Sequence, residues 1–428
     1  MDKSRIKSLD ILRGIAILLV FINHIEPRIS PAVSEVAGIS GFLFWKVKQL
    51  GWTGVDLFFV ISGFLVSGLL FSELEKKGTI DWRLFWIRRA FKIWPSYLLL
   101  LLVLAITDAT HYIDFTTPLS ALESIATHLL FLQNYIPSGN PNGPTWSLAI
   151  EEHFYILLPI LLSFIVALSA MLSLQWSDMI PWLTLLVIVA CLILRIATLN
   201  GTILADDYAR THLRIDSLMI GVYLNHLVRT YSPVLTWVQE HRLVALLAAV
   251  LLIVPAAFFN RIHPFMFSVG FLMLSIGYAI LLTLVYQGLL KPVESNFIMT
   301  GVARVGLWSY NIYLWHFFII MLPIPYYRIL NQMLGESIQS PGLQIAAQAS
   351  LFIATSILLG AFMTTLVENP FLSLRNRFFP SVTKAVIDGC VCSTAPDASD
   401  RKIPDYRECK TESRDRLSIT PRSSRTPD

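Results

Sequence analysis

Residues 9–27 read LDILRGIAILLVFINHIEP and decide the fold class of this chain. Apart from a few charged or titratable positions, this stretch is apolar over the roughly 20 residues that a helix needs to cross a bilayer. Similar runs recur along the 428 residues, of which 55% are hydrophobic and 14% charged. An ordinary soluble domain carries roughly 25% charged residues. The sequence therefore predicts a polytopic membrane protein.

The apolar runs predict an all-α bundle of about ten transmembrane helices. Each run is continuously apolar, whereas the strands of a membrane barrel alternate over about 10 residues. We expect one transmembrane domain over residues 1–375, followed over residues 376–428 by a cytoplasmic polar tail without fixed structure. The expected spans are residues 8–27, 53–72, 84–107, 151–173, 180–199, 212–230, 242–259, 265–287, 303–322 and 344–366.

The distribution of positive charge predicts the orientation. Lys3, Arg5 and Lys7 precede the first span, basic residues fill the connection at 76–89, and more follow the tenth span. By the positive-inside rule these segments face the cytoplasm. An even number of spans then places both termini there.

Charge and cysteine content exclude other classes of protein. The formal net charge of +4 is small and basic residues lie at span ends, so nucleic acid is not an expected partner. Cys191 lies in an apolar span, and Cys390, Cys392 and Cys409 lie in the polar tail. This spacing indicates neither a disulfide framework nor a metal site.

Two polar side chains interrupt the first span. Arg13 and His24 lie eleven positions apart on a similar helix face, roughly 16 Å along the axis. A charge at the bilayer centre costs about 2.5 to 3.5 kcal/mol on insertion scales, so it invites a functional explanation. Arg13, toward the cytoplasm, could hold a phosphorylated donor, and His24, toward the outer side, could serve an acceptor. Alternatively, Arg13 reaches the headgroups and His24 makes a packing hydrogen bond.

The second and third spans add an acid and a basic cluster. Residues 51–68, GWTGVDLFFVISGFLVSG, place Asp56 in an apolar run, where it could orient His24 or pair with an arginine. The glycines within residues 51–68 favour close helix packing. Residues 81–100, DWRLFWIRRAFKIWPSYLLL, place Arg88, Arg89 and Lys92 at the cytoplasmic boundary. This cluster could bind donor phosphates or anionic lipid.

The fourth span opens with a pair of carboxylates. Residues 144–159, PTWSLAIEEHFYILLP, place Glu151 and Glu152 beside His153. A carboxylate near an imidazole raises its basicity, so either glutamate could partner His24. They could also cap the start of the helix, with Trp146 at the membrane interface, and both roles can hold together.

Polar groups recur in the later spans. Arg214 and Asp216 lie two positions apart, cannot share one helix face and are expected to pair with different helices. For all the later groups we favour structural roles. They are His212, Arg214 and Asp216 in THLRIDSLMIG (211–221), Tyr310, Tyr313 and His316 in GLWSYNIYLWHFF (306–318), and Glu368 in VENPF (367–371).

Taken together, these strings resemble the acyltransferase-3 family of bacterial membrane O-acyltransferases, which modify O-antigen, exopolysaccharide, peptidoglycan or macrolide hydroxyls. The resemblance covers residues of about 8–375 and implies that Arg13 and His24 are the functionally required pair. It matches Arg89 and Lys92 to the family's basic motif, with a lysine that lacks the bidentate fork of arginine. Its seven elements occur in order: LDILRGIAILLVFINH, GVDLFFVISGFL, FWIRRAFKIWPSY, TWSLAIEEHFYILLP, THLRIDSLMIG, GLWSYNIYLWH and VENPF.

The resemblance implies transfer of a short acyl group from cytoplasmic acyl-coenzyme A, above all acetyl-coenzyme A, in the bacterial inner membrane. The acceptor would be a hydroxyl of a cell-surface glycan or its lipid-linked precursor. Membrane lipid is the other expected partner, and neither a bound cofactor nor a metal is expected. His24 would deprotonate the acceptor or carry the acyl group, with Glu151, Glu152 or Asp56 orienting it. The expected donor and substrate contacts are Arg13, Arg88, Arg89, Lys92, Tyr97, Trp146, His212, Arg214 and His316.

Two other classes of function stay open on the sequence. A transporter or flippase of a glycan or acyl intermediate would also use intramembrane His, Asp and Glu, as proton relays. A noncatalytic scaffold for polysaccharide assembly would leave the buried Arg13 and His24 unexplained.

Overall fold

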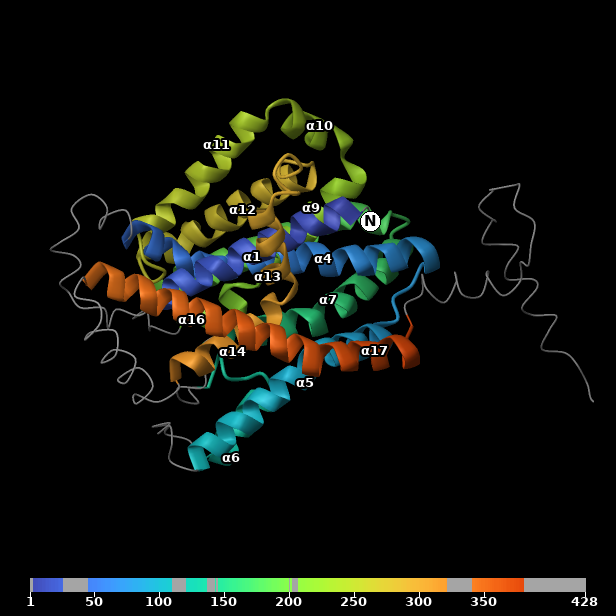
Figure 1. Cartoon of the computed structure of the whole chain (residues 1–428). Coiled ribbons are helices and arrows are strands. Elements are labelled where there is room, and N and C mark those ends of the chain that lie inside the picture. The colour runs from blue at the N-terminus through green and yellow to red at the C-terminus, as the bar shows by residue number, and fades with distance from the viewer. Residues whose placement is uncertain are drawn as a thin grey trace, which may run out of the picture. The chain divides into compact units, whose positions relative to one another are not determined.

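The computed structural model of this chain describes residues 3–25, 45–109, 121–136, 143, 145–199, 201, 207–321 and 341–380. Every regular element among these residues is a helix (Figure 1), which confirms the all-α class. The chain divides into two units, Met1–Leu372 and Ser373–Asp428. The predicted polar tail lies outside the described residues beyond residue 380.

Each predicted span coincides with one or more helices whose ends are shifted. These are α1 (Lys3–His24), α4 (Gly54–Lys77), α5 (Trp82–Ala109), α7 (Thr145–Met171), α8 (Trp176–Leu199), α9 (Ile215–Thr230), α11 (Arg242–Ile253), α12 (Phe271–Tyr286), α13 (Phe297–Leu307), α14 (Ser309–Met321) and α16 (Pro341–Met363). The other helices are η1 (Gly51–Thr53), α6 (Ala121–Leu129), η3 (Asp207–Ala209), η4 (Thr211–Leu213), α10 (Ser232–Glu240), η5 (Val254–Ala257), η6 (Met266–Gly270), η7 (Thr364–Glu368) and α17 (Asn369–Phe378).

Several of these helices are long and apolar enough to cross a membrane. In the described part of the chain six qualify, or seven if the pair α10 and α11, bent by 93°, forms one span. The chain is therefore a multi-pass membrane protein, while the count of ten and the cytoplasmic placement of both termini stay predictions. The six are Trp45–Lys77, Trp82–Thr107, Thr145–Met171, Trp176–Leu199, Met266–Tyr286 and Ala346–Phe378.

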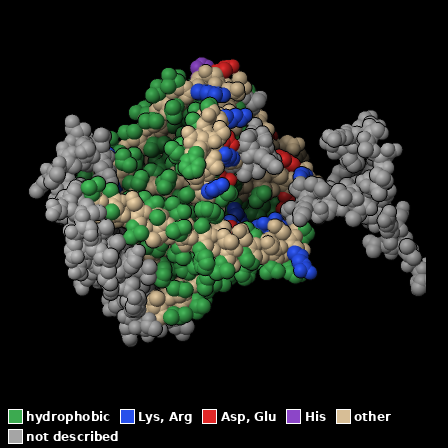
Figure 2. Space-filling view, viewed as in Figure 1, with side chains coloured by type: hydrophobic (Ala, Val, Ile, Leu, Met, Phe, Trp, Pro, Cys, Tyr) green, Lys and Arg blue, Asp and Glu red, His purple; other side chains and the backbone are tan. Residues whose placement is uncertain are grey.

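Large hydrophobic side chains remain exposed on these helices. Leu186 of α8 and Leu251 of α11 are 67% and 73% exposed. Figure 2 shows hydrophobic side chains over much of the viewed face, with the charged ones gathered toward one side. Such an apolar surface suits contact with lipid rather than water.

Two departures from the predicted spans affect the candidate residues. The span expected at 303–322 is broken at Trp308, whose φ of −90° and ψ of 0° separate α13 from α14. Helix α7 starts at Thr145 rather than at 151, so no acidic residue lies in its first turn. A prediction from hydropathy starts a helix where the long apolar run begins, so it leaves out helical turns that contain polar residues before that run. Glu151 and Glu152 therefore do not cap the start of this helix.

Close backbone contacts hold the helices around α1, which packs against α4, α12, α13 and α14 (Figure 1). A Cβ atom at Gly306 of α13 would lie 1.8 Å from the carbonyl oxygen of Asp10 in α1. Likewise, a Cβ at Gly63 of α4 would lie 2.0 Å from the carbonyl oxygen of Leu218 in α9. Only glycine permits such approach, so these two contacts set the distances between helices that carry the candidate residues.

Candidate active site

Two cavities in unit 1 contain most of the candidate residues. The larger, about 630 Å³, is lined from α1, α4, α5, α7, α9, α12 and α14 and includes Arg13; we call it the Arg13 cavity. The smaller, about 330 Å³, includes His24 and is called the His24 cavity. Val55 of α4 and Tyr313 of α14 line both. The two halves of the predicted Arg13 and His24 pair thus open into neighbouring spaces with a common wall.

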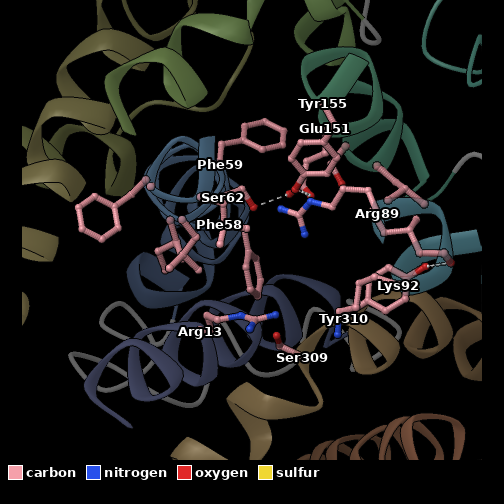
Figure 3. Close-up of a pocket in the computed structure, with 18 of the residues that line it drawn as sticks. Arg13, Phe58, Phe59, Ser62, Arg89, Lys92, Glu151, Tyr155, Ser309 and Tyr310 are labelled. Carbon is pink, nitrogen blue, oxygen red and sulfur yellow. Dashed lines mark hydrogen bonds between the residues drawn. The ribbon is translucent and has the colours of Figure 1, made fainter. Parts of the chain in front are cut away.

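Four basic side chains line the Arg13 cavity. Arg13 comes from α1, Arg89 and Lys92 come from α5, and Arg229, which pairs with Glu75, comes from α9. Figure 3 shows the guanidinium groups of Arg13 and Arg89 pointing into the cavity from different helices. Spacing of three positions places Arg89 and Lys92 on one helix face. Arg88, one position earlier, does not line the cavity.

Arg13, Arg89 and Lys92 differ in how they are neutralised. Lys92 forms an ion pair with the carboxylate of Glu368, which also accepts a 2.6 Å hydrogen bond from Asn311 Nδ2. In contrast, no carboxylate among the described residues lies within ion-pair distance of Arg13 or Arg89. The Arg89 guanidinium instead lies 4.4 Å from the centre of the Tyr155 ring. Two arginines are therefore available to bind an anion.

The adjacent glutamates of α7 have different surroundings. Glu151 lines the Arg13 cavity and accepts hydrogen bonds from Ser62 Oγ at 3.2 Å and Tyr155 OH at 2.6 Å (Figure 3). Glu152 is buried and lines neither cavity. Within the described residues neither glutamate hydrogen-bonds to His24, so the predicted partnership has no contact to support it here.

His24 has one ring nitrogen engaged. Its Nδ1 lies 2.9 Å from the carbonyl oxygen of Val20. A carbonyl oxygen only accepts, so Nδ1 carries a proton, and in the neutral ring Nε2 keeps the lone pair. The same holds for His316, whose Nδ1 lies 2.6 Å from the carbonyl oxygen of Tyr313. The two imidazole centres are 5.0 Å apart. His24 is thus set in the tautomer that a base or nucleophile requires at Nε2.

A buried ion pair forms another part of the His24 cavity. Asp56 of α4 pairs with Arg214, and both side chains are 1% exposed. Asp216 pairs instead with Arg195 of α8 at 2.6 Å. The prediction that Arg214 and Asp216 pair with different helices is confirmed. Of the two roles considered for Asp56, the structure has the pairing with arginine.

Some candidate residues lie away from both cavities. Tyr97 donates a 2.9 Å hydrogen bond to the carbonyl oxygen of His128 in α6. His212 stacks on Tyr135, with their ring centres 5.6 Å apart. Together with Arg88 and Glu152, they line neither cavity. His316 also lines neither cavity, but its ring centre lies 5.0 Å from that of His24, which does. Their predicted contacts with substrates stay predictions.

Sequence reasoning missed three residues that line the His24 cavity, namely Trp52, Tyr208 and Arg261. Each lies in a connection between apolar runs: Trp52 in η1, Tyr208 in η3, and Arg261 between η5 and η6. None of the three is a charged residue within an apolar run, so no local signal marked these positions.

Comparison with known proteins yields a consistent set of relatives. A family model described as an acyltransferase domain matches residues 6–366. A Staphylococcus aureus (strain COL) protein provisionally named an O-acetyltransferase is 28% identical over 346 residues, 75% of this chain and 52% of that protein. The peptidoglycan O-acetyltransferase OatA of Listeria monocytogenes is 26% identical over 371 residues, 81% of this chain and 56% of its own.

A Bacillus subtilis (strain 168) protein, provisionally named a peptidoglycan O-acetyltransferase, is 28% identical over 342 residues, 76% of this chain and 50% of its own. The chain thus spans about half the length of these curated relatives. No solved structure matches it.

Proposed function

The chain belongs to the acyltransferase family whose domain model matches residues 6–366, and on that premise we propose that it is a membrane O-acetyltransferase. It would move an acetyl or other short acyl group from acyl-coenzyme A to a hydroxyl of a bacterial cell-surface glycan or its lipid-linked precursor. The names of its relatives support the acetyl group, and two of those names support peptidoglycan as one acceptor to test. The proposed location is the bacterial cytoplasmic membrane.

One observation carries this proposal: a cavity with two arginines that have no ion-pair partner among the described residues shares a wall with the cavity of His24. Guanidinium groups match phosphate oxygens in geometry, so Arg13 and Arg89 would hold the phosphates of the donor. The volume of about 630 Å³ lies within the range of roughly 300–1,000 Å³ typical of small-molecule sites. Lys92, already paired with Glu368, would contribute less.

His24 would perform the chemistry at Nε2. As a base, it takes the proton of the acceptor hydroxyl while the oxygen attacks the thioester carbonyl, and the departing sulfur of coenzyme A receives that proton. As a nucleophile, Nε2 attacks the carbonyl first, which forms an acyl-imidazolium and releases the thiolate. The hydroxyl oxygen then attacks the acyl carbon, neutral His24 leaves, and the hydroxyl proton passes to the thiolate. Both routes yield an O-acyl ester and free coenzyme A.

The separation of the cavities defines the path of the acyl group. Val55 and Tyr313 line both spaces, so the acyl end of a donor held by Arg13 would meet His24 only at this wall. The acceptor would then occupy the His24 cavity and approach from the other side.

The direct test uses the purified full chain in proteoliposomes with labelled acetyl-coenzyme A and a mixture of cell-surface glycans. We expect release of coenzyme A together with alkali-labile acetyl on the glycan, and loss of both in His24→Ala. The matched control is His241→Ala, an exposed histidine that lines neither cavity. Full activity in folded His24→Ala would refute the assigned role. Glycan movement without donor consumption would favour a flippase.

A further inference from the structure

Arg261 differs from the other arginine of the His24 cavity. Arg214 is paired with Asp56, but within the described residues no carboxylate lies within ion-pair distance of Arg261. The Arg261 guanidinium carbon lies 4.0 Å from the centre of the Tyr208 ring, and both residues line the cavity. A cation–π contact holds a guanidinium against the ring while leaving N–H groups available to donate. Arg261 is thus a cation held against an aromatic ring, and its N–H groups can donate to a bound anion.

Aromatic groups line the same cavity. Trp52, Trp146 and Tyr208 contribute to its wall, and the ring centres of Trp146 and Tyr208 are 5.1 Å apart in an edge-to-face arrangement. Trp52 Nε1 is buried and has no acceptor among the described residues. A buried N–H without an acceptor is costly, and a hydroxyl oxygen of a bound molecule would satisfy it. Flat apolar faces with a polar N–H suit a ring that carries hydroxyl groups.

We propose that the His24 cavity is the acceptor site and that Arg261 recognises an anionic group, a carboxylate or phosphate, on that acceptor. The inference rests on the proposed function, since an acceptor presupposes acyl transfer. An arginine with a purely structural role would be expected to pair with an acid, as Arg214 does with Asp56. The donor phosphates have Arg13 and Arg89 in the other cavity, so Arg261 is left for a different anion.

The position of Arg261 would also orient the acceptor. His24 and Arg261 line one cavity of about 330 Å³, at the lower end of the range for small-molecule sites. A bound anion would therefore be held within the same small space as the His24 imidazole. Anchoring one end of the acceptor restricts which of its hydroxyl groups can reach Nε2.

The anion could come from two sources that share this chemistry. One is an acidic sugar in the glycan, and the other is the diphosphate of a lipid-linked precursor. Four acceptors separate them: a neutral glucose oligosaccharide and its glucuronic acid counterpart, each free and linked to polyprenyl diphosphate. If KM for the free acidic oligosaccharide depends on Arg261, the anion is the acidic sugar. If KM depends on Arg261 for the two diphosphate-linked acceptors and for neither free one, the anion is the diphosphate.

The test compares Arg261→Gln, Arg261→Lys and wild type in proteoliposomes with all four acceptors. For the anionic acceptors we expect KM to rise about 10- to 100-fold in Arg261→Gln, as for the loss of a charge-assisted hydrogen bond, with kcat changed much less. Arg261→Lys should recover part of the loss. KM for the free neutral oligosaccharide should change less than about twofold. Arg242→Gln, an exposed arginine that lines neither cavity, is the control.

Equilibrium binding of tritium-labelled oligosaccharides without donor separates this inference from the proposed function. If binding depends on Arg261 but no acyl transfer occurs, the anion site stands and the proposed activity fails. If transfer occurs and Arg261→Gln affects neutral and anionic acceptors equally, or affects neither, the anion site is refuted and the activity stands.

Discussion

The hydroxyl oxygen of Tyr313 lies 2.6 Å from Ser147 Oγ, which ties α14 to α7 at the wall shared by the two cavities. The Tyr313 ring also lies beside Phe58 and His316, with ring centres 6.1 Å and 5.6 Å apart. Tyr313 thus lies between the Arg13 cavity and the His24 cavity and lines both. The wall around it is where an acyl group would leave one cavity for the other.

Enlarging Val55 should block this passage. In Val55→Phe the added ring would fill space at the shared wall, so we expect acyl transfer to fall at least about 10-fold while the Kd for acyl-coenzyme A changes less than about threefold. The measurements are equilibrium binding and coenzyme A release. Overpacking can cost about 1 to 3 kcal/mol of stability, so thermal unfolding is recorded beside Val55→Ile. Unchanged transfer in a folded Val55→Phe would contradict the path.

Arg13 and Lys92 of the Arg13 cavity should respond differently to substitution. Arg13→Gln removes a cation without an ion-pair partner among the described residues, so KM for acyl-coenzyme A should rise about 10- to 100-fold with little loss of stability. Lys92→Met leaves the buried carboxylate of Glu368 without its cation, and should cost about 1 to 3 kcal/mol of stability.

The double variant Lys92→Met/Glu368→Gln should regain much of that stability, as a double-mutant cycle in thermal unfolding would show. A Lys92→Met protein as stable as wild type, with only KM changed, would instead make Lys92 a donor contact like Arg13.

The buried pair of Asp56 and Arg214 should behave as a structural unit. Asp56→Asn leaves a buried guanidinium uncompensated and is expected to cost about 3 to 5 kcal/mol. Asp56→Asn/Arg214→Gln removes both charges and should be more stable than the single variant. Thermal unfolding measures this recovery. If Asp56→Asn unfolds like wild type but loses acyl transfer, the carboxylate acts on the chemistry and not through this pair.

Two glycines of α13 provide a matched test of helix packing. A Cβ at Gly306 would lie 1.8 Å from the Asp10 carbonyl oxygen, whereas one at Gly301 meets nothing within 4 Å among the described residues. Gly306→Ala should force α13 away from α1 and lower the unfolding temperature. Gly301→Ala should raise stability by about 0.5 to 1 kcal/mol, because alanine loses less entropy in a helix. Equal effects of the two would contradict the close contact.

Much of the fold followed from local properties of the sequence. Each predicted range overlaps helix in the described residues, because a continuously apolar run of about 20 residues is too long for a barrel strand and satisfies its backbone in lipid as a helix. The separation of Arg214 from Asp216 also followed, since two positions rotate side chains to different faces. The break at Trp308 and the early start of α7 did not follow from the sequence. Hydropathy is averaged over a long window, which hides a single turn between two helices and a polar first turn of a helix.

The sequence by itself determined a multi-pass helical protein of the acyltransferase family and singled out Arg13 and His24, because apolar length and buried charge are written in consecutive residues. Only the tertiary structure decided that these two line different cavities, that Asp56 pairs with Arg214 from 158 positions away, and that Glu151 lies with Arg89 and Tyr155. Such partners depend on how each helix rotates and how closely neighbours pack, which contacts such as Gly306 on Asp10 set.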